Sequence, residues 1–247
     1  MAKEKRRLTQ EVEKIYDKQA GDFAEHAPTL LWWKHVGVPA YDRNIGGFYG
    51  RKEVKALDLG SASGRVPQLL IERGIPPENI MGVEISGEQV AIARKRVPKA
   101  TFIHGDITEV ELPSNTFDLV TSNMVFEFLD PEGLTKAVKN AHGSLKSGGT
   151  LFFVTTHPDK MKKDSGLKKP GRFEVAFPWG GSGPNYYRTK EDFRSALEKS
   201  GFEIDKVEEL GIPPEAEKDD PVKFEAFNKY KHIRLAVKSH KPQTKTS

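Results

Sequence analysis

The chain has 247 residues, of which 36% are hydrophobic and 30% are charged, so it is long enough to bury one full hydrophobic core. It holds 0 cysteines, which excludes disulfide frameworks, thiolate catalysis and cysteine-bound zinc and is typical of a cytoplasmic protein. The 39 Lys and Arg exceed the 35 Asp and Glu by 4 without one dense basic stripe, and no apolar run approaches ~18 residues, so we expect neither a nucleic-acid partner nor a membrane span.

Residues 1–50 are predicted to form a cap whose pattern differs from that of the rest of the chain. Leu8, Val12, Ile15 and Tyr16 recur at helical spacing, which predicts an amphipathic helix. The stretch that follows is rich in proline, glycine and tryptophan and is expected to be helical or loop-like.

From residue 54 onward, apolar strand patterns alternate with helical patterns. Strands are predicted over 54–59, 80–85, 101–104, 117–122, 149–156, 202–210 and 232–238, and helices over 65–73, 88–97, 131–145 (with Asp130 as N-cap) and 189–200. This alternation predicts an α/β fold with a Rossmann-like, doubly wound and mostly parallel sheet over residues 51–240, followed by a flexible tail over 241–247. Ligands bind such sheets at the carboxyl ends of the strands, so the loops after those ends are expected to meet at one rim.

One long interruption, residues 159–188, separates the fifth predicted strand from the last predicted helix. An excursion of about 30 residues within a compact domain is usually functional or disordered, and the aromatic residues here favour function. Gly180, Gly181 and Gly183 could hinge the segment as a lid that excludes water, although a surface flap that gates nothing is the alternative.

The loop between the first strand and the first helix of this domain reads Asp58-Leu59-Gly60-Ser61-Ala62-Ser63-Gly64. Its small residues allow a tight turn and close approach of the backbone to a ligand, and the following helix presents free N–H groups. A dinucleotide site would need the longer spacing G-x-G-x-x-G, and a leading carboxylate would repel a pyrophosphate but suits an amino-acid cation. An ordinary glycine-rich turn is the alternative interpretation.

Two more carboxylates follow the next two strands. Glu84 ends the second strand and could accept both hydroxyls of a ribose, whereas Asp106 follows the third strand and could accept a hydrogen bond from an adenine amine. A helix cap and a turn-forming Gly-Asp pair are the respective alternatives. Acidic positions after three successive strands at one rim are difficult to explain by chance.

These segments resemble the class I S-adenosylmethionine-dependent methyltransferases, in particular the small-molecule branch that includes ubiquinone and menaquinone methyltransferases. The resemblance runs from about residue 54 to residue 154 and rests on LDLGSASGR, GVEIS, HGDITEVELPSNTFDLV and LKSGGTLFFVT. Ala62 departs from the family pattern, which more often has glycine there. The resemblance implies S-adenosylmethionine as cofactor and a seven-stranded sheet whose last strand is antiparallel and lies between the fifth and sixth.

The resemblance also implies roles for single residues. Asp58, Gly60 and Gly64 would hold the methionine end, Glu84 the ribose, and Asp106 and Ile107 the adenine, while Asn123 and Met124 would line the methionine side. The full set expected at the cofactor comprises Asp58, Gly60, Ser61, Ala62, Gly64, Arg65, Glu84, Ile85, Asp106, Ile107, Asn123, Met124 and Tyr16.

A sulfonium methyl group is already activated, so transfer is an in-line displacement that depends mainly on positioning. A general base is needed only when the acceptor carries a proton. The candidates for catalysis are His157, which follows the fifth strand, and Tyr187; lining of the pocket without titration is the alternative for His157. The small-molecule acceptor is expected to contact Trp32, Trp33, Glu127, His157, Trp179, Tyr186, Tyr187 and Arg188.

Other functions predict other features. Enzymes that methylate amines of nucleic-acid bases commonly have an N-P-P-Y-like turn after the fourth strand, but residues 122–125 here read Ser-Asn-Met-Val and lack both prolines. An RNA or protein methyltransferase and a non-catalytic S-adenosylmethionine-binding protein therefore stay as alternatives, and a nicotinamide dehydrogenase is disfavoured by the glycine spacing. No histidine, acidic or cysteine spacing predicts a metal site.

Overall fold

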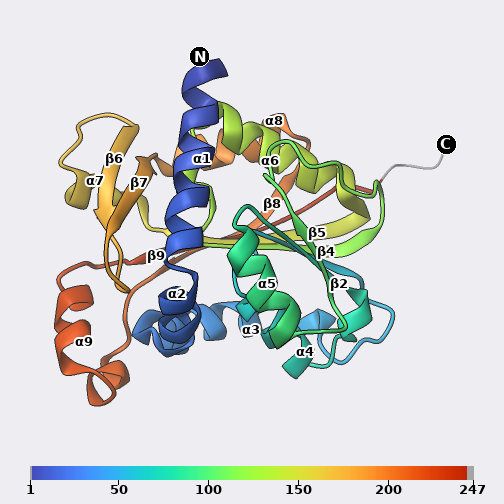
Figure 1. The fold of residues 1–247 in the computed structure, drawn as a ribbon, viewed down its shortest axis with the longest axis horizontal. Coiled ribbons are helices and arrows are strands. Elements are labelled where there is room, and N and C mark those ends of the chain that lie inside the picture. Colours follow the sequence, from blue (N-terminus) through green and yellow to red (C-terminus); the bar gives the residue numbers. More distant parts are fainter. Residues whose placement is uncertain (1, 244–247) are drawn as a thin grey trace.

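The computed structural model describes residues 2–243 and is built around a seven-stranded sheet with the strand order β3-β2-β1-β4-β5-β9-β8. Strands β1 to β5 pair in parallel, whereas β9 is antiparallel to both of its neighbours, β5 and β8. The predicted Rossmann-like sheet with an inserted antiparallel last strand is thereby confirmed (Figure 1).

The elements of this sheet follow the predicted alternation closely. Its strands are β1 (Ala56–Leu59), β2 (Ile80–Glu84), β3 (Thr101–His104), β4 (Phe117–Asn123), β5 (Leu145–Thr156), β8 (Glu203–Leu210) and β9 (Arg234–His240). The helices between them are α4 (Arg65–Glu72), α5 (Gly87–Arg96), α6 (Pro131–Ser144) and α8 (Lys190–Lys199). The predicted N-cap of α6 is confirmed, because the Asp130 carboxylate accepts a hydrogen bond from the Gly133 N–H.

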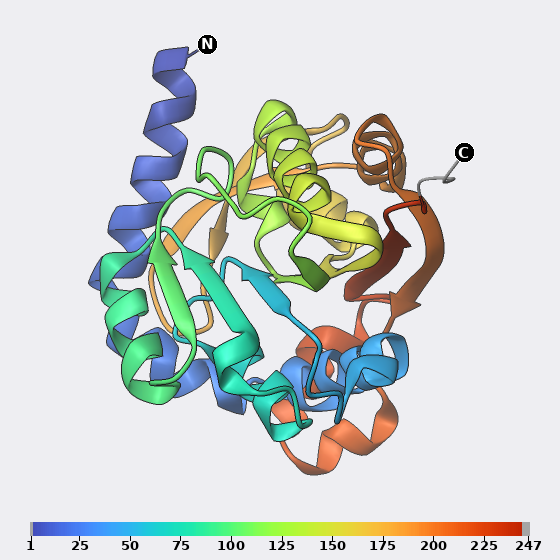
Figure 2. The ribbon, with the colours of Figure 1, turned by 90° about the vertical axis from the view of Figure 1, so that its right-hand side faces the viewer.

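Alternate residues along each central strand enter two separate cores, because successive side chains of a strand point to opposite faces. Phe152 packs on one face with α3 (Val38–Ile45) and α4, whereas its neighbour Phe153 packs on the other face with α6 and α8. The two helical layers on either side of the sheet are visible in Figure 2. Burial on both faces thus explains why Leu151–Val154 in β5 is a continuous apolar run.

The first part of the chain is almost entirely helical. It forms α1 (Ala2–Lys18), α2 (Ala20–His26), a π-helical stretch (Trp33–Gly37) and α3, joined or followed by short 3-10 turns at Ala27–Thr29 and Gly46–Phe48. α1 contacts α5 and the long interruption, while α3 covers the sheet. The first part of this segment therefore covers the strand ends, and its second part completes a hydrophobic core.

The long interruption is ordered secondary structure that the sequence patterns did not predict. It consists of α7 (Pro158–Ser165) and a hairpin of β6 (Gly171–Ala176) and β7 (Ser182–Tyr187), which forms a separate two-stranded sheet beside α1. A second unpredicted helix, α9 (Pro221–Asn228), precedes β9 and follows a 3-10 turn at Pro214–Lys218. Both segments are short and weakly periodic, so hydrophobic periodicity gave no signal for them.

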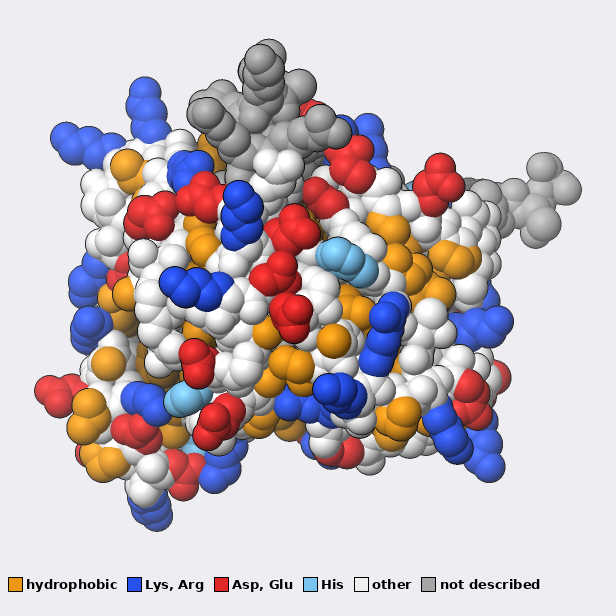
Figure 3. Space-filling model, viewed as in Figure 1, with side chains coloured by type: hydrophobic (Ala, Val, Ile, Leu, Met, Phe, Trp, Pro, Cys, Tyr) orange, Lys and Arg blue, Asp and Glu red, His pale blue; other side chains and the backbone are white. Residues whose placement is uncertain are grey.

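Acidic and basic side chains interleave on the face that Figure 3 shows, and they form no single stripe there. Many are paired within an element, such as Lys136 with Glu132, or between elements, such as Arg73 with Asp42. Among residues 2–243, no helix is both long enough and apolar enough to cross a bilayer.

Candidate functional site

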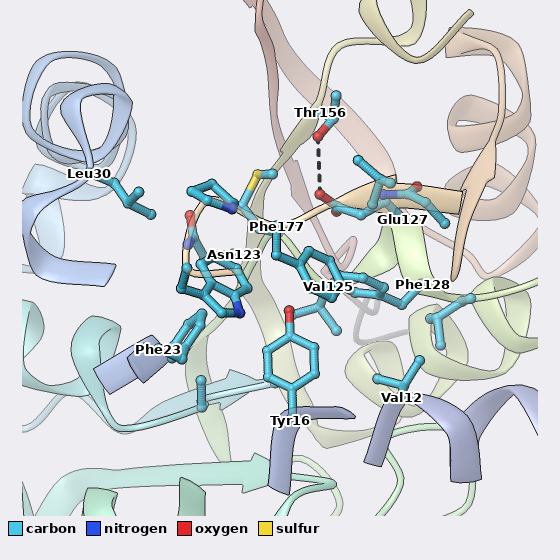
Figure 4. Close-up of a pocket in the computed structure, with 18 of the residues that line it drawn as sticks. Val12, Tyr16, Phe23, Leu30, Asn123, Val125, Glu127, Phe128, Thr156 and Phe177 are labelled. Carbon is cyan, nitrogen blue, oxygen red and sulfur yellow. Dashed lines mark hydrogen bonds between the residues drawn. The ribbon is translucent and has the colours of Figure 1, made fainter. Parts of the chain in front are cut away.

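A cavity of about 360 Å³ lies at the carboxyl ends of strands β1 to β5, the position at which parallel sheets bind ligands. Its floor comes from the loops after these strands, and its roof from α1, α2 and the β6–β7 hairpin (Figure 4). The predicted rim therefore encloses a space, and the helical first segment and the interruption both contribute to its walls.

Two glycines allow the loop after β1 to follow the cavity wall. Gly60 has φ +75°, and a Cβ there would lie 2.3 Å from Val125 Cγ2, so any side chain would collide with the loop after β4. Gly64 has φ +82° and precedes α4, where a Cβ would lie 3.3 Å from the Ala93 side chain. Ala62 takes φ +44°, a left-handed conformation that is uncommon for a residue with a side chain.

Glu84 connects this loop to the end of β2. Its carboxylate accepts hydrogen bonds from the Ala62 N–H at 2.8 Å and from the Ser86 N–H at 2.9 Å, and it is 6% exposed. Burial raises the pKa of Glu84, while these two backbone hydrogen bonds oppose that rise. Each carboxylate oxygen keeps a further lone pair, so Glu84 can still accept hydroxyls from a ligand in the cavity.

The ends of β2 and β3 place one carboxylate and two apolar side chains side by side. Asp106 lines the cavity and accepts a hydrogen bond from the Thr108 N–H at 2.8 Å, which fixes its side chain. Ile85 and Ile107 line the cavity next to it, and Ile107 is buried. A flat apolar ring with an exocyclic amine would fit between these groups.

The loop after β4 carries two signs of a binding function. Asn123 lines the cavity, is 8% exposed, and its Oδ1 has no hydrogen-bond partner within residues 2–243. Met124, the next residue, has φ +58°, a conformation that costs about 1 kcal/mol or more for a residue with a side chain. A buried acceptor without a donor, held by a strained backbone, indicates that a ligand supplies the donor.

Three residues expected at the cofactor do not form the cavity wall. Asp58 is 1% exposed and accepts a hydrogen bond from Thr121 Oγ1 at 2.7 Å, and burial raises its pKa to about 7. Ser61 and Gly64 lie behind the wall, although they belong to the loop that forms it. Arg65 lines the cavity and donates a hydrogen bond to the Ala27 carbonyl at 2.6 Å.

Glu127 is a buried carboxylate at the opposite end of the cavity, on the 3-10 turn Phe126–Phe128. It is 1% exposed, and its two oxygens accept hydrogen bonds from Thr155 at 2.8 Å and from Thr156 at 3.2 Å, the second of which is drawn in Figure 4. Burial raises its pKa. Arg188, which is 1% exposed, donates hydrogen bonds to the carbonyls of Phe126 and Leu129 and so holds this turn in place.

Two cations that were not among the predicted site residues, Arg234 and Lys160, line the cavity. Arg234, the first residue of β9, pairs in register with Thr156 and lines the cavity. Lys160 also lines the cavity, but its ammonium group is ion-paired with Asp164. No local pattern pointed to Arg234, because only the insertion of β9 next to β5 brings it to the rim.

Aromatic side chains close the cavity on the side that faces away from the strand ends. The Tyr16 ring lies 5.6 Å from that of Phe23 and 5.8 Å from that of Phe128, and its hydroxyl points into the cavity (Figure 4). Phe177 and Trp179 stack on each other at 5.1 Å at the tip of the hairpin. Burial raises the pKa of Tyr16, so its hydroxyl keeps its proton at neutral pH.

The two tryptophans of the first segment separate in the structure. Trp32 lines the cavity, with the Arg234 guanidinium carbon 4.2 Å from its ring centre. Trp33 instead packs in the core, where Arg65 stacks on it at 4.1 Å. Only Trp32 is therefore placed to contact a bound molecule.

His157 and Tyr187, the sequence candidates for catalysis, do not line the cavity. Tyr187 packs in the core beside Met161, and Tyr186 stacks on Arg188 at 5.3 Å. His157 is fully buried, and its Nδ1 accepts a hydrogen bond from the Asp159 N–H at 3.2 Å, which caps α7. Glu127, by contrast, lines the cavity and is a buried carboxylate that could accept a proton.

His157 instead joins a cluster with Glu209 and His232, whose potential ligand atoms lie within 4.8 Å of one another. The cluster has the composition of a metal site, but the tautomer of His157 opposes this use. Because Nδ1 accepts the Asp159 N–H, the neutral ring carries its proton on Nε2, the atom that faces Glu209 at 3.8 Å. Lys190 also forms an ion pair with Glu209, which neutralises that carboxylate.

The central part of the chain, residues 57–153, matches the family described as a methyltransferase domain. The match extends from β1 into β5 and so includes four of the loops that form the cavity floor.

Curated relatives and solved structures agree with that match. Demethylmenaquinone methyltransferase of Chlorobaculum tepidum is 28% identical over 141 residues, covering 53% of this chain and 57% of that protein. Trans-aconitate 2-methyltransferase of Rhodopseudomonas palustris is 32% identical over 127 residues, covering 51% of this chain and 46% of that protein, so the chain spans about half the length of these relatives. The structure of an S-adenosylmethionine-dependent methyltransferase from Mesorhizobium loti has a TM-score of 0.65 at 20% identity, covering 85% of this chain and 98% of that one, which shows a shared fold.

Proposed function

We propose that residues 57–153, which match the methyltransferase-domain family, form a class I S-adenosylmethionine-dependent methyltransferase domain and that the protein methylates a small-molecule acceptor. The observation that carries the proposal is the cavity itself. It collects, at the ends of adjacent strands, a tight glycine turn, the carboxylates of Glu84 and Asp106, and the unpartnered Asn123 oxygen.

These groups fit the parts of S-adenosylmethionine. Glu84 would accept the ribose hydroxyls, and Asp106 with Ile107 would hold the adenine. The Asn123 Oδ1 would accept a hydrogen bond from the ammonium group of the methionine end, close to the turn at Gly60. Asp58, behind that turn, would contribute charge rather than a direct contact.

S-adenosylmethionine, when bound, would supply an electrophilic methyl group: a lone pair of the acceptor would form the new bond to the methyl carbon, and the electrons of the broken carbon–sulfur bond would stay on the sulfur of the departing S-adenosylhomocysteine. The protein then needs to align the acceptor and to remove its proton where it has one. Glu127 is placed for the second task, because it is buried at the acceptor end and its raised pKa makes it a stronger base than a surface carboxylate. Thr155 and Thr156 orient the carboxylate that receives the proton.

A small acceptor is favoured over a macromolecule by the form of the cavity. The aromatic roof of Tyr16, Phe177 and Trp179 covers a cavity of about 360 Å³ at the strand ends, a size that suits a small molecule. The interleaved surface charges also offer no track for an RNA backbone on the face shown in Figure 3. The two relatives above are named for small acceptors, a demethylmenaquinone and trans-aconitate, which supports the same substrate class.

The test is a thermal shift followed by turnover. At about 100 times its Kd, S-adenosylmethionine or S-adenosylhomocysteine should stabilise the fold by about 2.7 kcal/mol and raise Tm by roughly 5–10 °C. Glu84→Gln should abolish most of this rise, whereas Glu78→Gln, an exposed control on the preceding turn, should keep it. A shift with NADH but with neither of these ligands would overturn the proposal.

Turnover separates an enzyme from a binding protein. Incubation with methyl-labelled S-adenosylmethionine and a small-metabolite extract should transfer label to a small product. Binding of the cofactor without transfer to metabolites, RNA or protein would assign a non-catalytic role, and transfer to RNA or protein alone would refute the small-molecule acceptor.

A further inference from the structure

We propose that Arg234 is the specificity residue of the acceptor site and that it binds a carboxylate carried by an otherwise apolar acceptor. This inference rests on the proposed function and narrows its substrate class. The carboxylate serves here as the anchor of the acceptor, so it need not be the group that is methylated.

The guanidinium of Arg234 is buried without an anionic partner. The residue is 5% exposed, and its one hydrogen bond within residues 2–243 runs from Nη1 to the Ile233 carbonyl at 2.9 Å. Its Nε is buried with no acceptor, and no carboxylate of the described residues forms a salt bridge with the group. Burial lowers the pKa of Arg234 to about 10, so the side chain is still charged at neutral pH.

Such a charge is costly to bury, and a ligand anion would offset the cost. Arg188 provides the contrast within the same chain. It is also buried, but its guanidinium donates to the carbonyls of Phe126 and Leu129, so its donors serve the fold. The Nε and Nη2 edge of Arg234 has no such use, and this edge matches the two oxygens of a carboxylate.

The neighbouring carboxylates do not occupy this edge. Neither Glu127 nor Asp164 forms a salt bridge with Arg234: Glu127 is held by hydrogen bonds from Thr155 and Thr156, and Asp164 is ion-paired with Lys160. Glu127 still attracts Arg234 over a longer distance, which helps to keep it charged. Arg65, the other arginine of the cavity, lies next to the glycine turn and so belongs to the cofactor end.

The surroundings of Arg234 define the rest of the acceptor. Its guanidinium carbon lies 4.2 Å from the centre of the Trp32 ring and 5.9 Å from that of Phe227, and both rings line the cavity. A molecule that reaches Arg234 therefore lies against aromatic surface. An acid with an aromatic or alkyl body satisfies both the charge and the apolar wall.

The experiment compares acids with their uncharged amides. Wild-type protein saturated with S-adenosylhomocysteine is titrated with benzoate, phenylacetate and 3-phenylpropionate, and with the three corresponding amides, while tryptophan fluorescence reports binding beside Trp32. In at least one pair the acid should bind 10-fold or more tightly than the amide, a ratio that corresponds to ~1.4 kcal/mol. Arg234→Gln should abolish this preference, and Arg194→Gln, an exposed arginine on α8, should retain it.

Thermal stability distinguishes a ligand-binding arginine from a structural one. Replacing a structural arginine should lower Tm, whereas replacing a ligand-binding arginine should not. The Tm of ligand-free Arg234→Gln should equal or exceed that of wild type, since an unpaired buried charge is removed. If this variant does not fold, Arg234→Lys, which keeps the charge but loses the planar fork, should reduce the preference for the acid.

The results separate the two proposals. Equal binding of acid and amide in all three pairs, no binding of any acid, or a preference that persists in the folded Arg234 variant would overturn the role of Arg234. Failure of the wild type to bind S-adenosylhomocysteine would instead overturn the proposed function.

Discussion

At the scale of single residues, the cavity separates groups that hold a ligand from groups that hold the fold. Glu84 and Asp106 line it, and their carboxylates are oriented by backbone N–H groups of neighbouring loops. Arg188 and His157 are buried polar groups of similar prominence in the sequence, but their hydrogen bonds fix a turn and cap a helix. Chemical type alone therefore does not identify the functional residues, because the same side chains serve both purposes.

The residue that this distinction favours for proton transfer is Glu127. Glu127→Gln keeps the shape and the acceptor for one threonine but cannot take a proton, so turnover of a proton-bearing acceptor should fall by about 10²–10⁴. Cofactor affinity should change little. Since burial raises the pKa of Glu127, wild-type turnover should rise as pH increases through that raised value, where the carboxylate form appears.

A pH profile of kcat for wild type, Glu127→Gln and the exposed control Glu78→Gln checks this assignment. The acidic limb should disappear only in Glu127→Gln. Unchanged turnover in that variant would show that positioning alone drives the transfer.

At the scale of elements, the β6–β7 hairpin and the first helices form one roof. Gln19, between α1 and α2, accepts a hydrogen bond from Trp179 Nε1 at 3.1 Å and donates one to the Gly180 carbonyl at 2.9 Å. Gly181 lies so close that a Cβ there would be 2.3 Å from the Gln19 amide nitrogen. The hairpin tip is thus attached to the junction of two helices that come about 160 residues earlier.

Gln19→Ala should loosen this attachment and make the roof open more often. Two hydrogen bonds contribute about 0.5–1.5 kcal/mol each, so release of S-adenosylhomocysteine should accelerate by roughly 5- to 150-fold. Gln68→Ala on α4, which removes a glutamine bonded to Glu72 on the surface, is the matched control. Stopped-flow fluorescence measures the release rate, and equal rates in wild type and Gln19→Ala would mean that the hairpin is a fixed wall.

At the scale of the whole molecule, the central sheet buries a carboxylate that makes stability depend on pH. Asp58 is 1% exposed in β1, and burial raises its pKa from 3.8 to about 7. Between pH 3.8 and about 7, Asp58 is protonated in the folded chain but ionised in the unfolded chain. Its contribution to the free energy of unfolding is therefore fully present below pH 3.8 and is lost as the pH rises through about 7. The folded chain thus carries the cost of ionising a buried carboxylate next to the proposed methionine site.

Asp58→Asn should remove the cost while an amide oxygen still accepts the Thr121 hydroxyl. Urea unfolding at pH 8 should show a free energy of unfolding higher than that of wild type by about 1–4 kcal/mol, with a smaller difference at pH 5. Affinity for S-adenosylmethionine should fall at the same time. A variant that is less stable than wild type at pH 8 would show that the charged form is well compensated in the native sheet.

The sequence by itself determined the sheet and its ligand edge. β5 contains the apolar run Leu151–Val154, β1 is a short apolar strand around Asp58, and β2 ends at a carboxylate, so local patterns were enough to place Glu84, Asp106 and the turn at Gly60 at one rim. Only the tertiary structure decided the acceptor end. In the structure His157 lies outside the cavity and Arg234 lines it. Both placements depend on the antiparallel insertion of β9 and on the fold of residues 158–187, which rest on contacts between distant segments that no local pattern encodes.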